Sequence, residues 1–523
     1  MGMSEIAAGA TGVTASNNHD PSRPNIVVVL TDDQGPWAVP WRTPELHMPA
    51  LAQLASQGFR FDQFYCASPV CSPARASLLT GRMPSAHGVH DWLTGTRHPR
   101  AHADKYLENL LTLPQVLAGA GYSCAMSGKW HVGDTREPAP GFEQWYAHRY
   151  GGSPYYDAPI WNSEGEPDSE PRYFTDAVAE HAVEFLRNRP HDKPFFLWAA
   201  TTAPHDPWLD GNHPKELVDL YAEELFPSVP REPRHPWTQA RVKDFDYAFA
   251  NPEPALRGYF AALSGVDRML KSILAELEQQ NIADNTVVLF MSDNGFSCGH
   301  HGVWGKGNGT YPLNFWDNSV QVPAVLSLPE KIRKHHHIEV SSDVVEHPVS
   351  AVDVFPTLVE LAAATAPTDP LRAGTSMLEI LRDRSADAEA AYTADGEENR
   401  DGNFRHPVVV FDEYGGGRMI RTPRWKLVER WAAEEPDELY DMVNDPQERC
   451  NLLDNQSAGT ATRIEGKDPE GIARALSAQL TQWFAAHETK EFSAFDRPVK
   501  GFGQILPAWR STGKDAFVQG PDE

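Results

Sequence analysis

A cysteine and an arginine one helical turn apart are the first residues in this chain that could do chemistry. Cys71-Ser72-Pro73-Ala74-Arg75 places a guanidinium within reach of an anionic group held at the cysteine side chain. The run continues through Leu79-Thr80-Gly81, and the full pattern is hard to obtain by chance. The competing interpretation is a buried structural cysteine at a helix start, and the extended pattern favours the reactive one.

Two polar pairs could bind a metal ion, because each follows an apolar run typical of a buried strand. They are Asp32-Asp33 and Asp293-Asn294. In a doubly wound sheet, ligands bind beyond the carboxyl ends of the strands, where such residues meet. Three carboxylates and an amide are hard oxygen ligands suited to Ca²⁺, with Mg²⁺ as the alternative. Either pair alone is more typical of a turn or a helix cap. Together with Cys71, the two pairs predict a metal site.

Four further side chains are cations or imidazoles that follow predicted strands or lie in Gly-rich loops. Lys129 and His131 are two residues apart, so in an extended chain they share one face. His205 stands between Pro204 and Asp206-Pro207, and Lys306 stands between two glycines. Each of them alone is more typical of a solvated loop. Their order along the chain is what makes them candidate site residues.

The combined pattern resembles that of the type I, formylglycine-dependent sulfatases, which are arylsulfatase-like members of the alkaline phosphatase superfamily. Asp-Asp, Cys-x-Pro-x-Arg, Lys-x-His, Pro-His, Asp-Asn and Lys occur here in the family order, and the resemblance runs from about Asn25 to Asp454. It implies that a formylglycine-generating enzyme oxidises Cys71 to an aldehyde. It also implies a metal site, usually holding calcium, made by Asp32, Asp33, the modified Cys71, Asp293 and Asn294.

A formylglycine would supply chemistry that a thiol lacks. Its hydrate is a gem-diol, of which one hydroxyl attacks sulfur and displaces the alcohol. Loss of the proton from the second hydroxyl then re-forms the aldehyde and releases sulfate. A divalent cation would stabilise charge on the sulfuryl oxygens and lower the pKa of the attacking hydroxyl. The resemblance therefore implies hydrolysis of a sulfate monoester to an alcohol and inorganic sulfate.

The same resemblance assigns roles to the remaining site residues. Arg75 would hold the diol or the ester oxygens, and Lys129 would bind the sulfate group. His131 would assist the release of sulfate, and His205 would contact the sulfate or the leaving oxygen. Lys306 would protonate the departing alkoxide. Beyond Lys306 the sequence departs from the Tyr-Glu-Gly-Gly of many relatives, which bears on the substrate.

The elements that must position these residues alternate between helix and strand. Apolar runs such as Asn25–Leu30 and Thr286–Met291 predict strands buried on both faces, and helical spacing such as that of Leu256–Asn281 precedes several of them. The alternation predicts an α/β fold built on a largely parallel sheet. The resemblance implies an alkaline-phosphatase-like arrangement, a large mixed, mainly parallel sheet flanked by helices. We expect a disordered tail at 1–23, a catalytic domain at 24–400, and at 401–523 a smaller α+β subdomain with a short antiparallel sheet and a tail.

Composition restricts the partners and the compartment. The chain has 46 Lys and Arg against 72 Asp and Glu, a formal net charge of -26, which argues against nucleic acid or an anionic membrane as partner. It lacks an apolar run of about 18 residues, so we expect no membrane span. Five cysteines do not suggest a disulfide framework, and the first 23 residues do not read as a secretory signal. The default location is the cytoplasm, or the periplasm or exterior if a signal was removed; the oligomeric state stays open.

Two other functions remain open at this point. A phosphonate or phosphate ester hydrolase could use the same formylglycine, because the cationic site tolerates one or two charges on the substrate. A non-catalytic binding protein derived from a sulfatase would have lost its nucleophile or its metal ligands, whereas every expected position is filled here. The expected substrate is a small-molecule or carbohydrate sulfate ester, since the aromatic inserts Glu137–Arg172 and Trp208–Pro254 suit an aryl group and a sugar ring equally. His87, His90 and His301 either line the pocket or pack in the interior.

Overall fold

A computed structural model describes most of the 523-residue chain. The described residues are 20–93, 106–238, 245–340, 342–383, 407–411, 416–431, 436–454 and 468–493. Most of the expected tail at 1–23 and the end of the chain beyond residue 493 lie outside these residues. The expected boundary at 400/401 also lies outside them, so the domain limits stay a prediction.

Among the described residues, eleven strands form one large mixed sheet in the order β12-β2-β11-β8-β1-β7-β3-β4-β5-β6, with β13 paired to β2. The central run β8-β1-β7-β3-β4 is parallel, and β11 is antiparallel to both β8 and β2. The strands are β1 (Asn25–Thr31), β2 (Phe59–Tyr65), β3 (Ser123–Lys129), β4 (Gln144–His148), β5 (Ala158–Trp161), β6 (Pro167–Glu170), β7 (Phe195–Ala200), β8 (Thr286–Ser292), β11 (Gln321–Ser327), β12 (Asp343–Val345) and β13 (Val349–Ser350).

The sheet separates two hydrophobic cores, and the alternation of side chains along β1 shows how. Ile26, Val28 and Leu30 enter one core, whereas Val27 and Val29 enter the other. A strand buried on both faces needs apolar residues at every position, because successive side chains point to opposite faces. The continuous apolar run of the sequence is thereby explained, and the predicted buried strand is confirmed.

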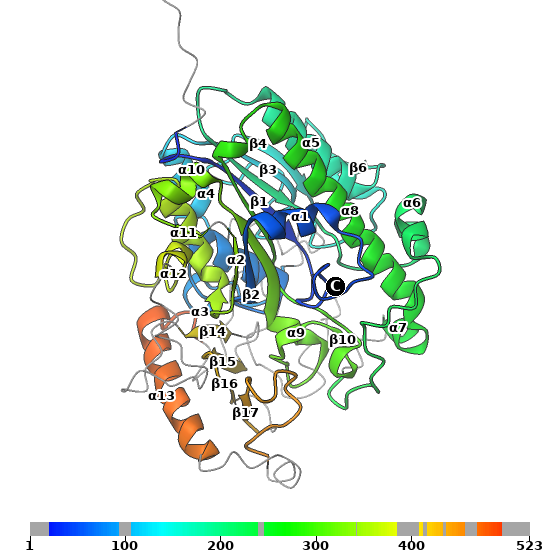
Figure 1. The fold of residues 1–523 in the computed structure, drawn as a ribbon, viewed down its shortest axis with the longest axis vertical. Helices are drawn as coiled ribbons and strands as arrows, with labels where there is room; N and C mark the ends of the chain where they lie inside the picture. Colours follow the sequence, from blue (N-terminus) through cyan, green and yellow to red (C-terminus); the bar gives the residue numbers. More distant parts are fainter. Residues whose placement is uncertain are drawn as a thin grey trace, which may run out of the picture.

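Helices cover both faces of the sheet (Figure 1). On one face pack α1 (Pro49–Gln57), α5 (Phe174–Asn188) and the long α8 (Pro252–Gln279). On the other pack α2 (Cys71–Thr80), α4 (Leu113–Gly119), α11 (Val354–Leu361) and α12 (Met377–Asp383). The shorter elements are α3 (Pro84–His87), α6 (Lys215–Val218), α7 (Asp246–Ala250), α9 (Asp317–Val320), α10 (Glu330–His335) and the two-stranded pair β9 (Ser297–Cys298) and β10 (Trp304–Gly305).

A separate antiparallel sheet lies at the C-terminal end of the chain, beside α13 (Pro469–His487), which is orange in Figure 1. Its strands are β14 (Val408–Phe411), β15 (Gly417–Arg421), β16 (Trp425–Arg430) and β17 (Glu438–Asp441). It shares a third core with the larger part, since Ala67, Met83 and Val352 pack among its apolar side chains. The predicted fold class, a large mixed sheet flanked by helices plus a small antiparallel sheet, is confirmed.

Candidate active site

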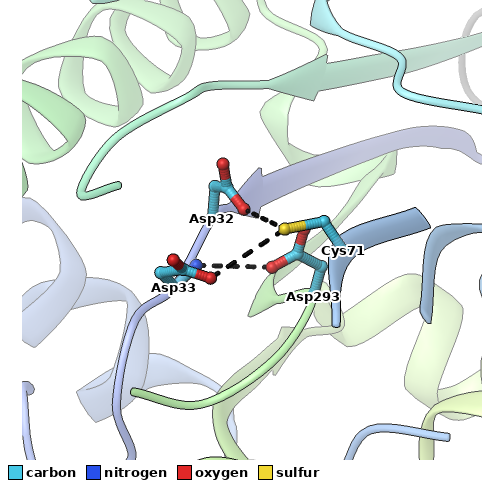
Figure 2. A group of neighbouring side chains, drawn as sticks. All are labelled: Asp32, Asp33, Cys71 and Asp293. Atoms are coloured by element: carbon cyan, nitrogen blue, oxygen red, sulfur yellow. Dashed lines mark hydrogen bonds between the residues drawn. The ribbon is translucent and has the colours of Figure 1, made fainter. Parts of the chain in front are cut away.

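The predicted site residues come together at the carboxyl ends of the central parallel strands. Asp32 and Asp33 follow β1, Asp293 follows β8, and Lys129 is the last residue of β3. Cys71 is the first residue of α2, and Figure 2 shows its side chain pointing at the three carboxylates. The sequence predicted a ligand site at the carboxyl ends of the parallel strands, and these side chains meet there.

The acidic residues and the thiol form a cluster with the dimensions of a metal site. Ligand atoms of Asp32, Asp33, Cys71 and Asp293 all lie within 4.8 Å of one another, and all four residues are buried (Figure 2). The Cys71 Sγ donates to an Asp32 carboxylate oxygen at 3.1 Å. The backbone of Asp33 has a φ of 65°, in the left-handed region, which aims two consecutive carboxylates into one space.

Asn294 supplies a test of whether a cation fits. Its side-chain nitrogen donates to an Asp33 oxygen at 2.7 Å, but its Oδ1 is buried without a partner among the described residues. Burial and the nearby Asp32 carboxylate raise the pKa of Asp293 to about 6, so the protein alone holds the third negative charge with difficulty. An orphaned hard oxygen beside crowded carboxylates fits Ca²⁺ or Mg²⁺.

Three buried cations face the carboxylates from other elements. Arg75 Nε donates to Asp293 at 2.8 Å, and Lys129 Nζ pairs with Asp32. Lys306 Nζ donates to an Asp33 oxygen at 2.6 Å and lies 2.9 Å from the Cys71 Sγ. A second nitrogen of Arg75, Nη2, is buried and has no partner among the described residues.

The Cys71 thiol is itself a poor nucleophile in this place. Burial, and next the Asp32 carboxylate, raise the pKa of the thiol, so it stays protonated at neutral pH. It accepts a hydrogen bond from Lys306 and donates one to Asp32. Position 71 therefore does not carry a reactive thiolate.

The two predicted histidines are held in opposite protonation states. Burial alone would lower the pKa of His205, but the carboxylates of Asp206 and Asp33 outweigh it and raise the pKa to about 9. Its Nδ1 lies 3.0 Å from Asp206 Oδ1 and its Nε2 lies 3.8 Å from Asp33. Burial, and then Lys129, lower the pKa of His131 well below its usual value, so that ring is neutral. A charged and a neutral imidazole at one site suit an acid and a base.

A loop within the insert Glu137–Arg172, to which the sequence analysis assigned no site residue, packs on both histidines. A Cβ added to Gly151 would lie 2.2 Å from the His131 Cε1, and one added to Gly152 would lie 3.1 Å from the His205 Cε1. The buried His148, at the end of β4, holds this loop, because its Nδ1 accepts from the Tyr150 N–H at 3.0 Å. Its Nε2 lies 2.7 Å from the Ser153 hydroxyl. The aromatic composition of the insert and its two adjacent glycines were the signals in the sequence.

Of the three histidines whose roles were open, His87 and His90 are fully buried and pack in the interior, whereas the exposure of His301 equals that of His131 and leaves its role a prediction. His87 is bonded to Ser77 Oγ at 3.0 Å, and His90 packs on Phe411 with ring centroids 5.7 Å apart. His301 stacks on a tryptophan, Trp316, with centroids 4.5 Å apart.

Within the described ranges, no helix is both long and apolar enough to cross a bilayer.

Known proteins are similar to this chain in both sequence and fold. A model of the sulfatase family matches residues 24–364, and a model of the C-terminal region of N-sulphoglucosamine sulphohydrolase matches residues 301–465. The choline-sulfatase of Rhizobium meliloti is 28% identical over 475 residues, which cover 83% of each chain. The ulvan-active sulfatase of Formosa agariphila is 27% identical and covers 97% of this chain and 91% of its own.

Solved structures show the same fold. A protein in complex with its substrate D-glucosamine-2-N,6-O-disulfate matches with a TM-score of 0.68 at 22% identity, covering 90% of this chain and 100% of its own. The phosphonate monoester hydrolase of Agrobacterium radiobacter matches with a TM-score of 0.64 at 19% identity, covering 89% of this chain and 96% of its own. At these identities the structures establish the fold, whereas the match of residues 24–364 to the family model establishes the family.

Proposed function

The chain belongs to the sulfatase family and is a sulfuric-ester hydrolase, and we propose that it cleaves sulfated saccharides by means of a formylglycine made from Cys71. The observation that carries the proposal is the surroundings of the Cys71 side chain. It lies between the carboxylate of Asp32 and the ammonium of Lys306, inside a cluster that fits a cation. That environment suits a hydroxyl that must lose a proton to attack sulfur.

We assign the metal to five side chains, in keeping with the sequence prediction. Asp32, Asp33, Asp293, Asn294 and the modified Cys71 would hold Ca²⁺, with Mg²⁺ as the alternative. When bound, the cation stabilises negative charge on the sulfuryl oxygens and makes the attacking hydroxyl easier to ionise. The orphaned Asn294 Oδ1 is the atom that most directly supports this assignment.

The cationic side chains bind and orient the sulfate ester. Arg75 keeps its Nε on Asp293 and leaves its buried Nη2 for an oxygen of the ester or of the side chain at position 71. Lys129, fixed on Asp32, contributes positive charge next to it. These two groups compensate the negative charge that a sulfate brings into a buried site.

We assign the delivery of protons to the leaving oxygen to His205 and Lys306. His205 is protonated at neutral pH because Asp206 and Asp33 face it, so its Nε2 can donate to an oxygen of the substrate. Burial alone would lower the pKa of Lys306, but the Asp33 carboxylate raises it well above its usual value. Lys306 is therefore a second donor, and we assign it the protonation of the departing alkoxide.

His131 has the properties of the base that releases sulfate. Its Nε2 lies 2.9 Å from the Leu93 carbonyl, which can only accept, so in the neutral ring Nε2 carries the proton. Its Nδ1 is then an acceptor, and it is buried without a partner among the described residues. We assign to Nδ1 the removal of a proton from the second hydroxyl at position 71.

Saccharide substrates are supported by the relatives. These include an N-acetylglucosamine-6-O-sulfatase of Bacteroides thetaiotaomicron, 26% identical over 502 residues, and the ulvan-active sulfatase. The test is to produce the chain together with a formylglycine-generating enzyme and to measure kcat/KM in the presence of Ca²⁺. Substrates would be 4-nitrophenyl sulfate, N-acetylglucosamine 6-sulfate and a phenylphosphonate ester.

Sulfate release at least about 100-fold faster than phosphonate cleavage, lost in Cys71→Ala, is the expected result, since removing the nucleophile removes the covalent route. If the phosphonate ester were cleaved faster than the sulfate esters, the result would favour the alternative function, a phosphonate hydrolase. Turnover of the aryl sulfate without that of the sugar would retain the chemistry and reject the substrate class.

A further inference from the structure

Two arginines pack on one tryptophan beside the active-site loop. The guanidinium carbon of Arg149 lies 4.4 Å from the ring centroid of Trp161, and that of Arg136 lies 4.6 Å from it. We refer to Arg136, Arg149 and Trp161 as the Arg–Trp–Arg cluster. Arg136 is exposed, and the other two residues are partly exposed, so solutes can reach the cluster.

Neither guanidinium in the Arg–Trp–Arg cluster is paired with a carboxylate among the described residues. Other arginines of the chain are paired, such as Arg172 with Glu170 and Arg268 with Asp176. The Nε of Arg149 is moreover buried and has no hydrogen-bond partner within the part of the chain that the structure describes. In a chain with 72 acidic and 46 basic residues, two adjacent unpaired arginines leave a local positive site.

The cluster is tied to the catalytic side chains through a short stretch of backbone. Arg149 directly follows His148, which is in register with Lys129 on the neighbouring strand. It stands two residues before Gly151, which packs against the His131 ring, and two residues span at most about 7 Å. The Trp161 Nε1 donates to the Thr135 hydroxyl at 3.0 Å, which fixes the ring on the loop that carries Arg136.

Packing on an aromatic ring orients a guanidinium without using its donors. A cation–π contact fixes the plane of the group, whereas a carboxylate partner would occupy the N–H groups. Two oriented guanidinium groups with unused N–H donors suit a planar or tetrahedral oxyanion, which they bind by charge-assisted hydrogen bonds. A lone sulfate ester at Cys71 would not need such a second site.

We propose that the Arg–Trp–Arg cluster binds a second oxyanion, a sulfate or a carboxylate, of a polyanionic saccharide whose scissile ester lies at Cys71. This inference rests on the proposed function and extends it to the class of saccharide. The cluster selects substrates, and it takes no part in the chemical step. Saccharides with a single sulfate would therefore bind more weakly than those with several anionic groups.

The test measures binding and does not depend on turnover. Isothermal titration calorimetry on the Cys71→Ala protein compares glucosamine 6-sulfate, a trisulfated heparin disaccharide and the carboxyl-reduced form of that disaccharide. We expect the disaccharide to bind at least tenfold more tightly than the monosulfate. In Arg136→Gln/Arg149→Gln on the same background, the ratio of the two Kd values should fall close to one. Arg149→Lys, which keeps the charge but loses the planar fork, should keep part of the ratio.

A matched control removes two arginines elsewhere. Arg268 and Arg474 each pair with an exposed glutamate, Glu216 and Glu470, and the variant Arg268→Gln/Arg474→Gln changes the net charge equally. It should keep the full ratio, and all variants should melt at the temperature of their parent. Tight binding of the carboxyl-reduced disaccharide identifies a sulfate as the second anion, and weak binding identifies the carboxylate.

A Kd ratio near one in the parent, or a ratio that survives the loss of both arginines, would overturn the inference. Because the calorimetry needs neither formylglycine nor catalysis, that outcome is separate from a failure of the proposed function. The latter would appear as absent sulfate-ester turnover in the matured enzyme.

Discussion

Two buried clusters in this molecule place a lysine among carboxylates, yet they differ in what they leave unpaired. In the candidate active site, Lys306 contacts Asp33 and the Cys71 thiol. At the junction with the C-terminal sheet, the fully buried Lys426 pairs with Asp317 at 2.8 Å and with Glu448 at 2.5 Å. We call these the active-site cluster and the junction cluster.

The junction cluster connects parts of the chain that are distant in sequence. Lys426 lies on β16 and Asp317 begins α9, and the Asp317 N–H donates to Glu448 at 2.6 Å. The Tyr65 hydroxyl, at the end of β2, donates to Asp317 at 3.2 Å. The charged groups of this cluster pair with one another, and only Glu448 Oε1, which meets Lys426 as an ion-pair partner, lacks a hydrogen bond among the described residues of the cluster. The result is a link between the two sheets.

The active-site cluster leaves several polar groups unpaired. Asn294 Oδ1, Arg75 Nη2 and His131 Nδ1 are buried without partners among the described residues. Unsatisfied buried groups cost stability unless a ligand meets them. The comparison teaches that a buried ion pair is not by itself evidence for catalysis, whereas orphaned donors and acceptors around a potential nucleophile are.

The largest expected difference between the clusters concerns activity. Asp33→Asn removes a charged metal ligand, and we expect kcat to fall by about 10³-fold or more, because the cation stabilises the sulfuryl oxygens by several kcal/mol. In the parent protein, Ca²⁺ should raise the melting temperature, and chelation should reverse the rise. Asp33→Asn should lose most of this cation-dependent shift. Normal activity in Asp33→Asn would contradict the metal assignment. So would a melting temperature of the parent protein that does not change when Ca²⁺ is added.

The junction cluster should show the opposite behaviour, a loss of stability without a loss of chemistry. Lys426→Met leaves two buried carboxylates without their cation, which should reduce the free energy of unfolding by about 3 kcal/mol. Denaturant unfolding measures this change, and kcat of the folded protein should match the parent. Arg474→Gln, which breaks an exposed ion pair on α13, is the control and should cost less than about 1 kcal/mol. A kcat loss in Lys426→Met comparable to that in Asp33→Asn would remove the distinction between the clusters.

Lys306 sharpens the comparison, because it is the lysine with a proposed proton to deliver. In Lys306→Gln we expect kcat to fall by about 10²-fold for an alkyl sulfate, whose leaving oxygen needs a proton. The fall should be much smaller for 4-nitrophenyl sulfate, because nitrophenolate leaves without protonation. A series of sulfate esters with leaving groups of different pKa measures the slope. Equal losses across the series would assign Lys306 to sulfate binding instead.

The smallest expected effect tests whether geometry matters at the active site beyond charge. Gly151→Ala adds a Cβ that must displace the His131 ring or the loop, and we expect kcat/KM to fall about tenfold. Gly119→Ala is the matched control, since an added Cβ meets nothing within 4 Å there. Both variants should keep the melting temperature within a few degrees. An unchanged kcat/KM in Gly151→Ala would show that the loop does not position His131.

Much of the site could be predicted because its parts are local in sequence. The polar pairs Asp32-Asp33 and Asp293-Asn294 each follow an apolar strand. The carboxyl ends of neighbouring parallel strands lie at one edge of the sheet, so the two pairs are expected to lie close together. Arg75 stands one helical turn after Cys71, and its guanidinium meets Asp293, which sequence spacing alone could not reveal. The enzymatic nature of the chain, predicted from the filled pattern, is confirmed by its relatives.

Contacts that depend on tertiary packing could not be predicted. The sequence around Lys426 predicts an ordinary strand residue. Of its two partners, Asp317 precedes it by more than a hundred residues, and Glu448 lies beyond the next strand. Arg149 and Arg136 lie close together because both pack on the ring of Trp161, the last residue of β5. Such pairs carry no periodic signal, since nothing in local propensity or hydrophobic pattern specifies which distant side chain completes them.

The central claim is that position 71 acts as a formylglycine, and mass spectrometry of the Cys71 peptide from catalytically active protein tests it most directly. The aldehyde lowers the peptide mass by about 18 Da relative to cysteine, and its hydrate, of equal nominal mass to the thiol, resists alkylation. We predict that the aldehyde fraction rises in proportion to sulfate-ester turnover across preparations with different degrees of maturation. Full turnover by protein whose Cys71 is quantitatively alkylated would contradict the account.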